Sequence, residues 1–389
     1  MLHSESEVSR SLAMAPAAAV QAVSASAYPL APLLPATSKS HSAKRLIRAH
    51  KMASVTSQVG LGTDVLISMA AFKPRSGDLV AVKVLSENPG YDRLELTSGR
   101  MARLSIGDVF IGVLGARRAL KGYVGDVPSE LTVGDELAIL NLGGVVGRCS
   151  GFNQAMGQPV RIEFLGAVLH DGQICNLADY ALPLIDPPAD CPPVILVSGS
   201  CMHAGKTRVA VELVRRFTAA GYQVAAGKVS GVACLKDTME MRDNGASRTL
   251  SFADFGLPST VGIADLGAVA KSIVGHLAAS SPDVIVIELG DGLLGGYNVS
   301  SVLDNTHIRD VMEAMVFCAG DFVSAWGGVE LLKKYGLKPD VISGAVTDSR
   351  MGIEFIRSEL GIPAANAMVG GTALFALVQA KLLAAKEAT

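Results

Sequence analysis

The residues of this chain that are best suited to chemistry lie together in the run Gly199-Ser200-Cys201-Met202-His203-Ala204-Gly205-Lys206-Thr207. The run follows the apolar segment Val194–Val197 and precedes a helical pattern. The backbone N–H groups of such a loop, with the positive end of the following helix, can hold phosphate oxygens. Lys206 would then reach the outer phosphates, and the Thr207 hydroxyl would be a ligand of Mg²⁺. All nine residues are therefore predicted to bind the phosphates of a cofactor.

Two further charged residues stand at or near the ends of apolar runs. Glu288 ends the run Val284–Ile287. A carboxylate buried there without a partner would cost on the order of several kcal/mol, so we expect it at the open strand end, facing metal or water. Lys228 lies near the end of Val224–Val229, where a protonated lysine could hold substrate charge. The predicted catalytic residues are Lys206, Lys228 and Glu288, and Thr207 and Glu288 are predicted to ligate the metal.

The region after residue 193 alternates strand-like and helical patterns. Further strand-like runs occupy Ala314–Ala319 and Val341–Val346, and helical patterns occupy Thr207–Ala219, Leu266–Ala279 and Phe322–Tyr335. This alternation predicts an α/β domain over 194–389, with a doubly wound, mostly parallel sheet and a site at the carboxyl ends of the strands.

The region 61–182 has a different texture, with short apolar runs separated by Gly-Asp turns. It predicts a small all-β domain, either a barrel or a sandwich. Its Arg117-Arg118 and Gly143-Gly144 pairs are typical of a solvated edge and of turns, and a ligand surface is the less favoured interpretation. Residues 181–193 include five prolines and predict a stiff linker to the next domain.

Residues 1–60 are predicted to be a disordered tail. No acidic residue occurs between Glu7 and Asp64, and the segment is rich in Ala and Ser. A nonessential extension would have this composition, and so would an organellar transit peptide. We therefore expect a cytoplasmic protein and keep an organellar location as the alternative.

Composition excludes several classes of function. The chain has 34 Lys and Arg against 36 Asp and Glu, so it has no basic field for nucleic acid. No apolar stretch is long enough to predict a transmembrane helix, so we expect a soluble protein without a membrane partner. The six cysteines form no C-x-x-C pair, which fits a reducing compartment. We expect a small-molecule substrate as the partner, and a homodimer stays open.

The loop, with spacing G-x5-G-K-T, resembles that of dethiobiotin synthetase and related P-loop NTPases. The likeness covers the C-terminal half only. It implies that Lys228 matches the second lysine of that group, that Asp243 matches its acidic metal position with Asp237 as a competitor, and that Glu288 matches its glutamate-glycine element. Because the loop differs at Cys201 and His203 and a β domain precedes it, the chain would form a separate branch.

These observations predict an enzyme that uses ATP and Mg²⁺, most specifically an ATP-dependent ligase or synthetase acting on a small carboxylate or amine. One alternative is a coenzyme A-dependent N-acyltransferase, because the loop recognises phosphate and not the reaction. The other is a GTP-binding regulatory or cofactor-delivery protein. An Asn-Lys-x-Asp guanine-reading element is absent from the sequence.

Overall fold

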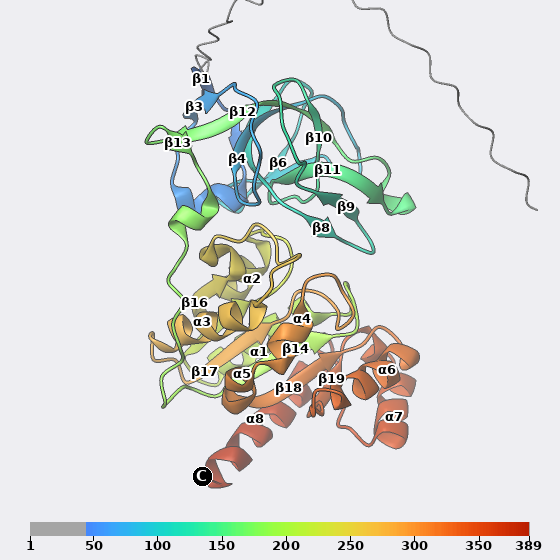
Figure 1. The fold of residues 1–389 in the computed structure, drawn as a ribbon. Helices are drawn as coiled ribbons and strands as arrows, with labels where there is room; N and C mark the ends of the chain where they lie inside the picture. Colours follow the sequence, from blue (N-terminus) through green and yellow to red (C-terminus); the bar gives the residue numbers. More distant parts are fainter. Residues whose placement is uncertain (1–43, 389) are drawn as a thin grey trace, which may run out of the picture. The chain divides into compact units, whose positions relative to one another are not determined.

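The apolar runs in the first half of the chain form a closed β barrel. The computed structural model describes residues 44–388 (Figure 1). Five strands pair in a cycle that returns to its first member, in the order β12 (Arg161–His170), β4 (Leu79–Val84), β7 (Val109–Leu114), β11 (Val145–Phe152) and β10 (Glu136–Ile139). All of these pairs are antiparallel except β7 with β11. The prediction of an all-β region, with a barrel as one of its two forms, agrees with this sheet.

Shorter elements accompany the barrel, and the first two of them pair with each other in a separate sheet. They are β5 (Arg93–Glu95), β6 (Met101–Arg103), β8 (Arg117–Arg118), β9 (Tyr123–Asp126), β13 (Gln173–Ile174) and the 3₁₀ helices η2 (Gln154–Met156) and η3 (Leu177–Tyr180). The strand β8 pairs antiparallel with β9, which continues to β11. The barrel therefore carries a hairpin, β8–β9, at one end of its strand order.

The barrel begins earlier than predicted. β1 (Lys44–Arg48) pairs antiparallel with β3 (Asp64–Ser68), β2 (Lys51–Met52) pairs with β7, and η1 (Ser54–Val59) follows. The predicted end of the tail at residue 60 is therefore wrong for residues 44–60. The strand β1 is hard to detect because four of its five side chains are exposed. The rest of the predicted tail, residues 1–43, lies outside the described residues.

The second half contains a parallel sheet, as predicted. Its strand order is β16 (Ala246–Ser251), β15 (Val224–Lys228), β17 (Val284–Glu288), β14 (Val194–Gly199), β18 (Met312–Cys318) and β19 (Val341–Ser343). Every neighbouring pair in it is parallel. The strand that leads into the phosphate-type loop, β14, is therefore central, between β17 and β18.

Helices cover both faces of this sheet, so it is doubly wound. Successive side chains of β14 alternate between two apolar clusters: Ile195 and Val197 pack with α1 (Lys206–Ala219) and α8 (Gly371–Ala388), whereas Val194 and Leu196 face the other way, toward α3 (Leu266–Ala278). The remaining helices are α2 (Lys236–Asp243), η4 (Phe252–Phe255), α4 (Val299–Asp304), α5 (Thr306–Val311), α6 (Phe322–Lys333), η5 (Ala345–Thr347), α7 (Arg350–Phe355) and the π-helical turn η6 (Ile356–Leu360). Within residues 44–388, none of the helices is long and apolar enough to cross a membrane.

The barrel and the parallel sheet share one hydrophobic core. The cluster that contains Leu79 and Phe164 of the barrel continues through Phe252 and Phe255 to Ile285 and Ile287 of β17. A side chain at Gly143 of the barrel would overlap the Ala233 carbonyl oxygen, so only glycine permits this approach. The two halves are therefore packed together as parts of one unit.

The predicted stiff linker is held against helix α3. The N–H of Ile185 donates to Ser272 Oγ at 2.9 Å, and Ser272 Oγ donates back to the Ile185 carbonyl at 2.9 Å. Asp186 forms an ion pair with Lys271. The segment therefore fastens the two halves by side-chain contacts as well as by proline stiffness.

A buried carboxylate from the barrel holds the start of α2. The side chain of Glu95, at 1% exposure, accepts a hydrogen bond from the Leu235 N–H at 2.7 Å and another from Ser54 Oγ. Leu235 directly precedes α2. The interaction joins the barrel to the segment between β15 and α2.

Replacing Glu95 by alanine should destabilise the protein, because the Leu235 N–H and the Ser54 hydroxyl would lose their acceptor in a buried place. An unsatisfied buried group costs about 1–3 kcal/mol. Glu330→Ala is the matched control, since Glu330 is half-exposed in its ion pair with Lys333 and such pairs contribute little. Urea unfolding should show a lower midpoint for Glu95→Ala alone, and equal midpoints would contradict the role assigned to Glu95.

Candidate functional site

The loop from Gly199 to Thr207 joins the central strand β14 to helix α1, in the setting that the sequence predicted. His203 has a φ of 66° and Gly205 a φ of 101°, so the chain turns through two left-handed residues before the helix begins. The backbone N–H groups of Met202, His203 and Gly205 donate to no acceptor within the described part of the chain. They are available, with the N-terminus of α1, as donors to an anion.

Lys206 is the first residue of α1 and is buried, at 4% exposure. Its Nζ donates to the Cys201 carbonyl oxygen at 2.8 Å, across the loop. Burial lowers the pKa of Lys206, and the nearby Glu288 carboxylate opposes that shift. The ammonium group therefore lies inside the loop, where a bound phosphate would meet it.

Strand pairing brings Glu288 beside the loop. In the parallel register Val197 of β14 lies opposite Glu288 of β17. Thr207 Oγ1 donates to Glu288 Oε1 at 2.7 Å, while Glu288 Oε2 is buried without a hydrogen-bond partner in the structure. A buried carboxylate oxygen without a partner is costly, so this arrangement favours a cation at the oxygen.

These two residues fit Mg²⁺, which prefers carboxylate and hydroxyl oxygens and is often shared with substrate phosphates. Among residues 44–388, no group of three or more His, Cys, Asp or Glu side chains is close enough to hold a metal by itself. A metal held by Thr207 and Glu288 would therefore need further oxygen ligands from the bound molecule or from water.

The predicted third ligand, Asp243, is not brought to this site. It is exposed as the last residue of α2 and is not among the side chains that line the cavity around the loop. Its competitor Asp237 does line the cavity, from the first turn of α2. The α2 helix separates the two carboxylates by more than one turn, which explains why only one of them reaches the cavity.

Lys228 is in the cavity, as expected, but it is not a free cation. It lies opposite Glu288 in the register of β15 with β17, and its Nζ forms an ion pair with Asp237. Both partners are largely buried, with 12% and 16% side-chain exposure. Lys228 therefore brings its charge to the site already paired with a carboxylate, and its catalytic role stays a prediction.

The other loop side chains differ in exposure. Ala204 is buried, His203 is exposed, and Cys201 and Met202 are half-buried. Although His203 is exposed, partial desolvation of its ring lowers its pKa, and the charges of Lys121 and Lys206 act in the same direction. His203 therefore stays mainly neutral near neutral pH. The hydroxyl of Ser200 donates to the Cys201 sulfur at 3.7 Å.

A cavity of about 570 Å³ opens from the loop, a volume that fits a small ligand. Its wall includes residues that the sequence did not assign to the site: Asp291 after β17, Tyr297 further along, and Arg117 and Asn141 from the barrel. Arg117 does lie on an edge strand, β8, as the favoured interpretation expected, but its side chain is half-buried and lines the cavity. No local motif marks Asn141 or Tyr297, whereas Asp291 could have been found as the second carboxylate after the strand that ends at Glu288.

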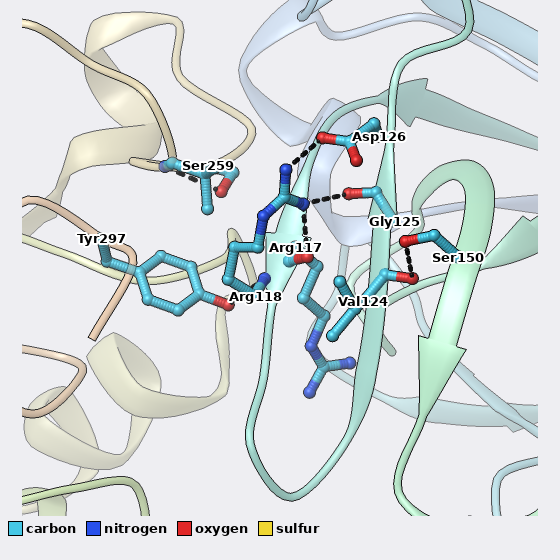
Figure 2. Close-up of polar contacts among 9 residues, drawn as sticks. Arg117, Arg118, Val124, Gly125, Asp126, Ser150, Ser259 and Tyr297 are labelled. Atoms are coloured by element: carbon cyan, nitrogen blue, oxygen red, sulfur yellow. Dashed lines mark hydrogen bonds and ion pairs between the residues drawn. The ribbon is translucent and has the colours of Figure 1, made fainter. Parts of the chain in front are cut away.

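Asp291 adds a second buried carboxylate close to the lysine. It is 8% exposed, burial raises its pKa, and the Gly292 N–H and the Lys206 charge oppose that shift. The Tyr297 hydroxyl accepts a hydrogen bond from the Arg118 N–H at 3.1 Å (Figure 2). The barrel hairpin β8–β9 thus contacts the wall of the cavity directly.

No family model and no curated protein matches the chain. Among solved structures it is similar to the signal recognition particle receptor FtsY from Elizabethkingia anophelis in complex with GDP, at 18% identity over 48% of this chain and 60% of that one, with a TM-score of 0.33. It is also similar to the 54 kDa signal recognition particle protein from Aeropyrum pernix K1 in complex with GDP, at 14% identity over 54% of this chain and 52% of that one, with a TM-score of 0.35.

The chain spans about three fifths of the first of these structures. At these TM-scores the likeness carries no argument about the architecture or activity of this chain. The resemblance to the dethiobiotin synthetase-like group gains no support from it and stays a prediction.

Gly199 is the position where the loop depends most clearly on the absence of a side chain. A Cβ there would lie 2.8 Å from the Cys318 carbonyl oxygen and 2.9 Å from Lys206 Cγ. Gly199→Ala should therefore lower the free energy of unfolding by about 1–3 kcal/mol. Gly327→Ala is the matched control, because a Cβ there meets nothing within 4 Å and alanine favours its helix. Thermal unfolding measures the stability of both variants. A Gly199→Ala variant as stable as the parent would contradict the tight packing around Gly199.

Proposed function

We propose that this protein binds a nucleoside triphosphate together with Mg²⁺ and uses the terminal phosphoryl group. The observation that carries the proposal is the meeting of Thr207 and Glu288 at 2.7 Å beside the buried Lys206, with one Glu288 oxygen left without a partner. A phosphate loop alone would bind any phosphate. The added carboxylate is what favours a nucleotide bound with its metal.

Each residue would have a defined task. The amides of Met202, His203 and Gly205 would donate to phosphate oxygens, and Lys206 would add a charged donor that can turn from the Cys201 carbonyl to the ligand. Thr207 and Glu288 would hold the magnesium, which when bound neutralises charge on the phosphate oxygens. Burial of these groups removes competing water and strengthens each contact.

The more specific proposal is an ATP-dependent ligase or synthetase. The cavity supports it, because its wall continues beyond the loop to Arg117 and Asn141, whose polar groups a second small molecule would contact. A GTP-binding protein is one alternative, so GTP is titrated beside ATP. A coenzyme A acyltransferase is the other alternative that the experiments separate.

Lys206→Met should abolish nucleotide binding while the fold survives, because the change deletes the charged donor and keeps an apolar stem of similar length in a buried position. Lys333→Met is the control, since Lys333 is exposed in α6. Calorimetric titration with ATP, GTP and acetyl coenzyme A in Mg²⁺ buffer should show tight binding of at least one triphosphate to the parent. Affinity of Lys206→Met should fall by on the order of 10² or more. Undiminished binding would rule out the phosphate loop, and binding of acetyl coenzyme A alone would favour the acyltransferase.

Glu288→Gln should separate metal use from phosphate binding, because the amide keeps the shape of the side chain and removes its charge. We expect nucleotide turnover in Mg²⁺ to fall by on the order of 10² or more, while binding of nucleotide in a chelator changes little. Glu330→Gln is the control on an exposed helix position. Phosphate release with and without chelator is the measurement. Full product formation by the parent in chelator would exclude the metal-dependent reaction.

A further inference from the structure

The cavity has a second basic end, which the barrel supplies. At the loop end, the charges that act on Lys206 come from Glu288, Asp291 and Lys228, all from the parallel-sheet half. At the other end, burial raises the pKa of Tyr297, the positive charge of Arg117 opposes that shift, and the negative charge of Asp291 adds to it. The Asp291 carboxylate thus acts to raise the pKa of both Lys206 and Tyr297. The cavity lining thus includes a cationic side chain from the loop, Lys206, and one from the barrel, Arg117.

The two arginines of the β8–β9 hairpin, Arg117 and Arg118, make different contacts. Arg117 lies opposite Gly125 and Arg118 opposite Val124, and neighbouring residues of a strand point to opposite faces. Figure 2 shows the Arg118 guanidinium turned to Gly125 and Asp126. It donates to the Gly125 carbonyl at 2.9 Å and forms an ion pair with Asp126 at 2.5 Å. The charge of Arg118 is thus used within the barrel.

Arg117 has no such carboxylate. Its Nη1 donates to Tyr91 Oη at 3.1 Å and to the Leu140 carbonyl, which fixes the guanidinium in place. Its Nε is buried without a partner, and within the described chain no acidic side chain forms an ion pair with Arg117. A positioned guanidinium that lines a cavity and lacks a counterion is a receptor for an anion.

Asn141 supplies a fixed polar group beside it. Its Nδ2 donates to the Ala233 carbonyl at 3.5 Å and its Oδ1 accepts from the Gly143 N–H at 3.2 Å. These contacts hold the amide at the junction of the barrel and the parallel sheet. The Arg117 end of the cavity is therefore built from positioned side chains rather than from mobile surface ones.

We propose that Arg117 binds the carboxylate of the second, small-molecule substrate, which rests on the nucleotide-dependent function proposed above. Nη1 already donates to Tyr91 and Leu140 and Nε is buried, so Nη2 is the donor left for a carboxylate oxygen, and the fixed positive charge of the guanidinium strengthens that hydrogen bond. The carboxylate on Arg117 serves as a handle, and the rest of the substrate extends toward the phosphate loop. The barrel thus selects the substrate while the parallel sheet binds the nucleotide.

The test measures nucleotide turnover by the full chain with a panel of probes: succinate, glutarate, aspartate and glutamate, their dimethyl esters, and glycerol 3-phosphate. At least one free acid should stimulate turnover, and its ester should not. In Arg117→Met the concentration of that acid needed for half-stimulation should rise by on the order of 10- to 100-fold. Arg117→Lys, which keeps the charge but loses the fixed, planar guanidinium, should fall between. Nucleotide affinity should be equal in all variants.

Arg103→Met is the control, because that exposed barrel arginine pairs with Asp92 and is not among the side chains that line the cavity, so this variant should respond to the acid as the parent does. Melting temperatures identify any variant that has lost its fold. If Arg117→Met has lost its fold, the half-stimulating acid concentration of Arg117→Lys alone tests the inference. The inference would be overturned if no free acid stimulated turnover, or if the esters stimulated it as well as the acids do. It would also be overturned if only glycerol 3-phosphate stimulated turnover, or if Arg117→Met and Arg117→Lys both responded to the acid as the parent does. If the parent binds and turns over nucleotide in those cases, only the Arg117 role fails. If the parent binds no nucleotide, the proposed function fails first.

Discussion

The parallel pairing of β14 with β17 is the constraint on which the rest of the site depends. It places Glu288 opposite Val197, and the pairing of β15 with β17 places Lys228 opposite the same glutamate. A shift of one residue in either pair would turn these side chains to the opposite face of the sheet. The apolar residues on both faces of the central strands fix that register, so the hydrophobic core determines where the charges lie.

The buried charges at this register depend on one another. Lys206 and Glu288 are each almost fully buried, and either alone would lose hydration without compensation. The Glu288 carboxylate favours the charged form of Lys206, and the Thr207 hydroxyl satisfies one oxygen of Glu288. The other oxygen of Glu288 has no hydrogen-bond partner, which lowers the stability of the folded protein. A cation bound at that oxygen would restore the lost stability.

The features that could be predicted from the sequence are those encoded in consecutive residues. The loop and strand β17 were predicted with bounds at or within about two residues of those observed, because buried apolar runs and glycine turns are recorded in consecutive residues. Sequence reasoning missed β16, whose sequence ASRTLS has no apolar run. The resemblance favoured Asp243 over Asp237, and the sequence does not show which turn of α2 faces the cavity. Arg117 and Asn141 could not be assigned, since their approach to the loop depends on the packing of two distant parts of the chain.

That packing gives the barrel control over the segment between β15 and α2. Ala233 is contacted by Asn141, the Leu235 N–H by Glu95, and the same segment separates Lys228 from its partner Asp237. With Lys228 neutralised by that pair, the carboxylates of Glu288 and Asp291 are left close to any bound triphosphate. Negative charges that lie close together in a buried cavity repel strongly unless a cation lies between them. The electrostatics of the cavity therefore favour a nucleotide that arrives with its magnesium over one that arrives without it.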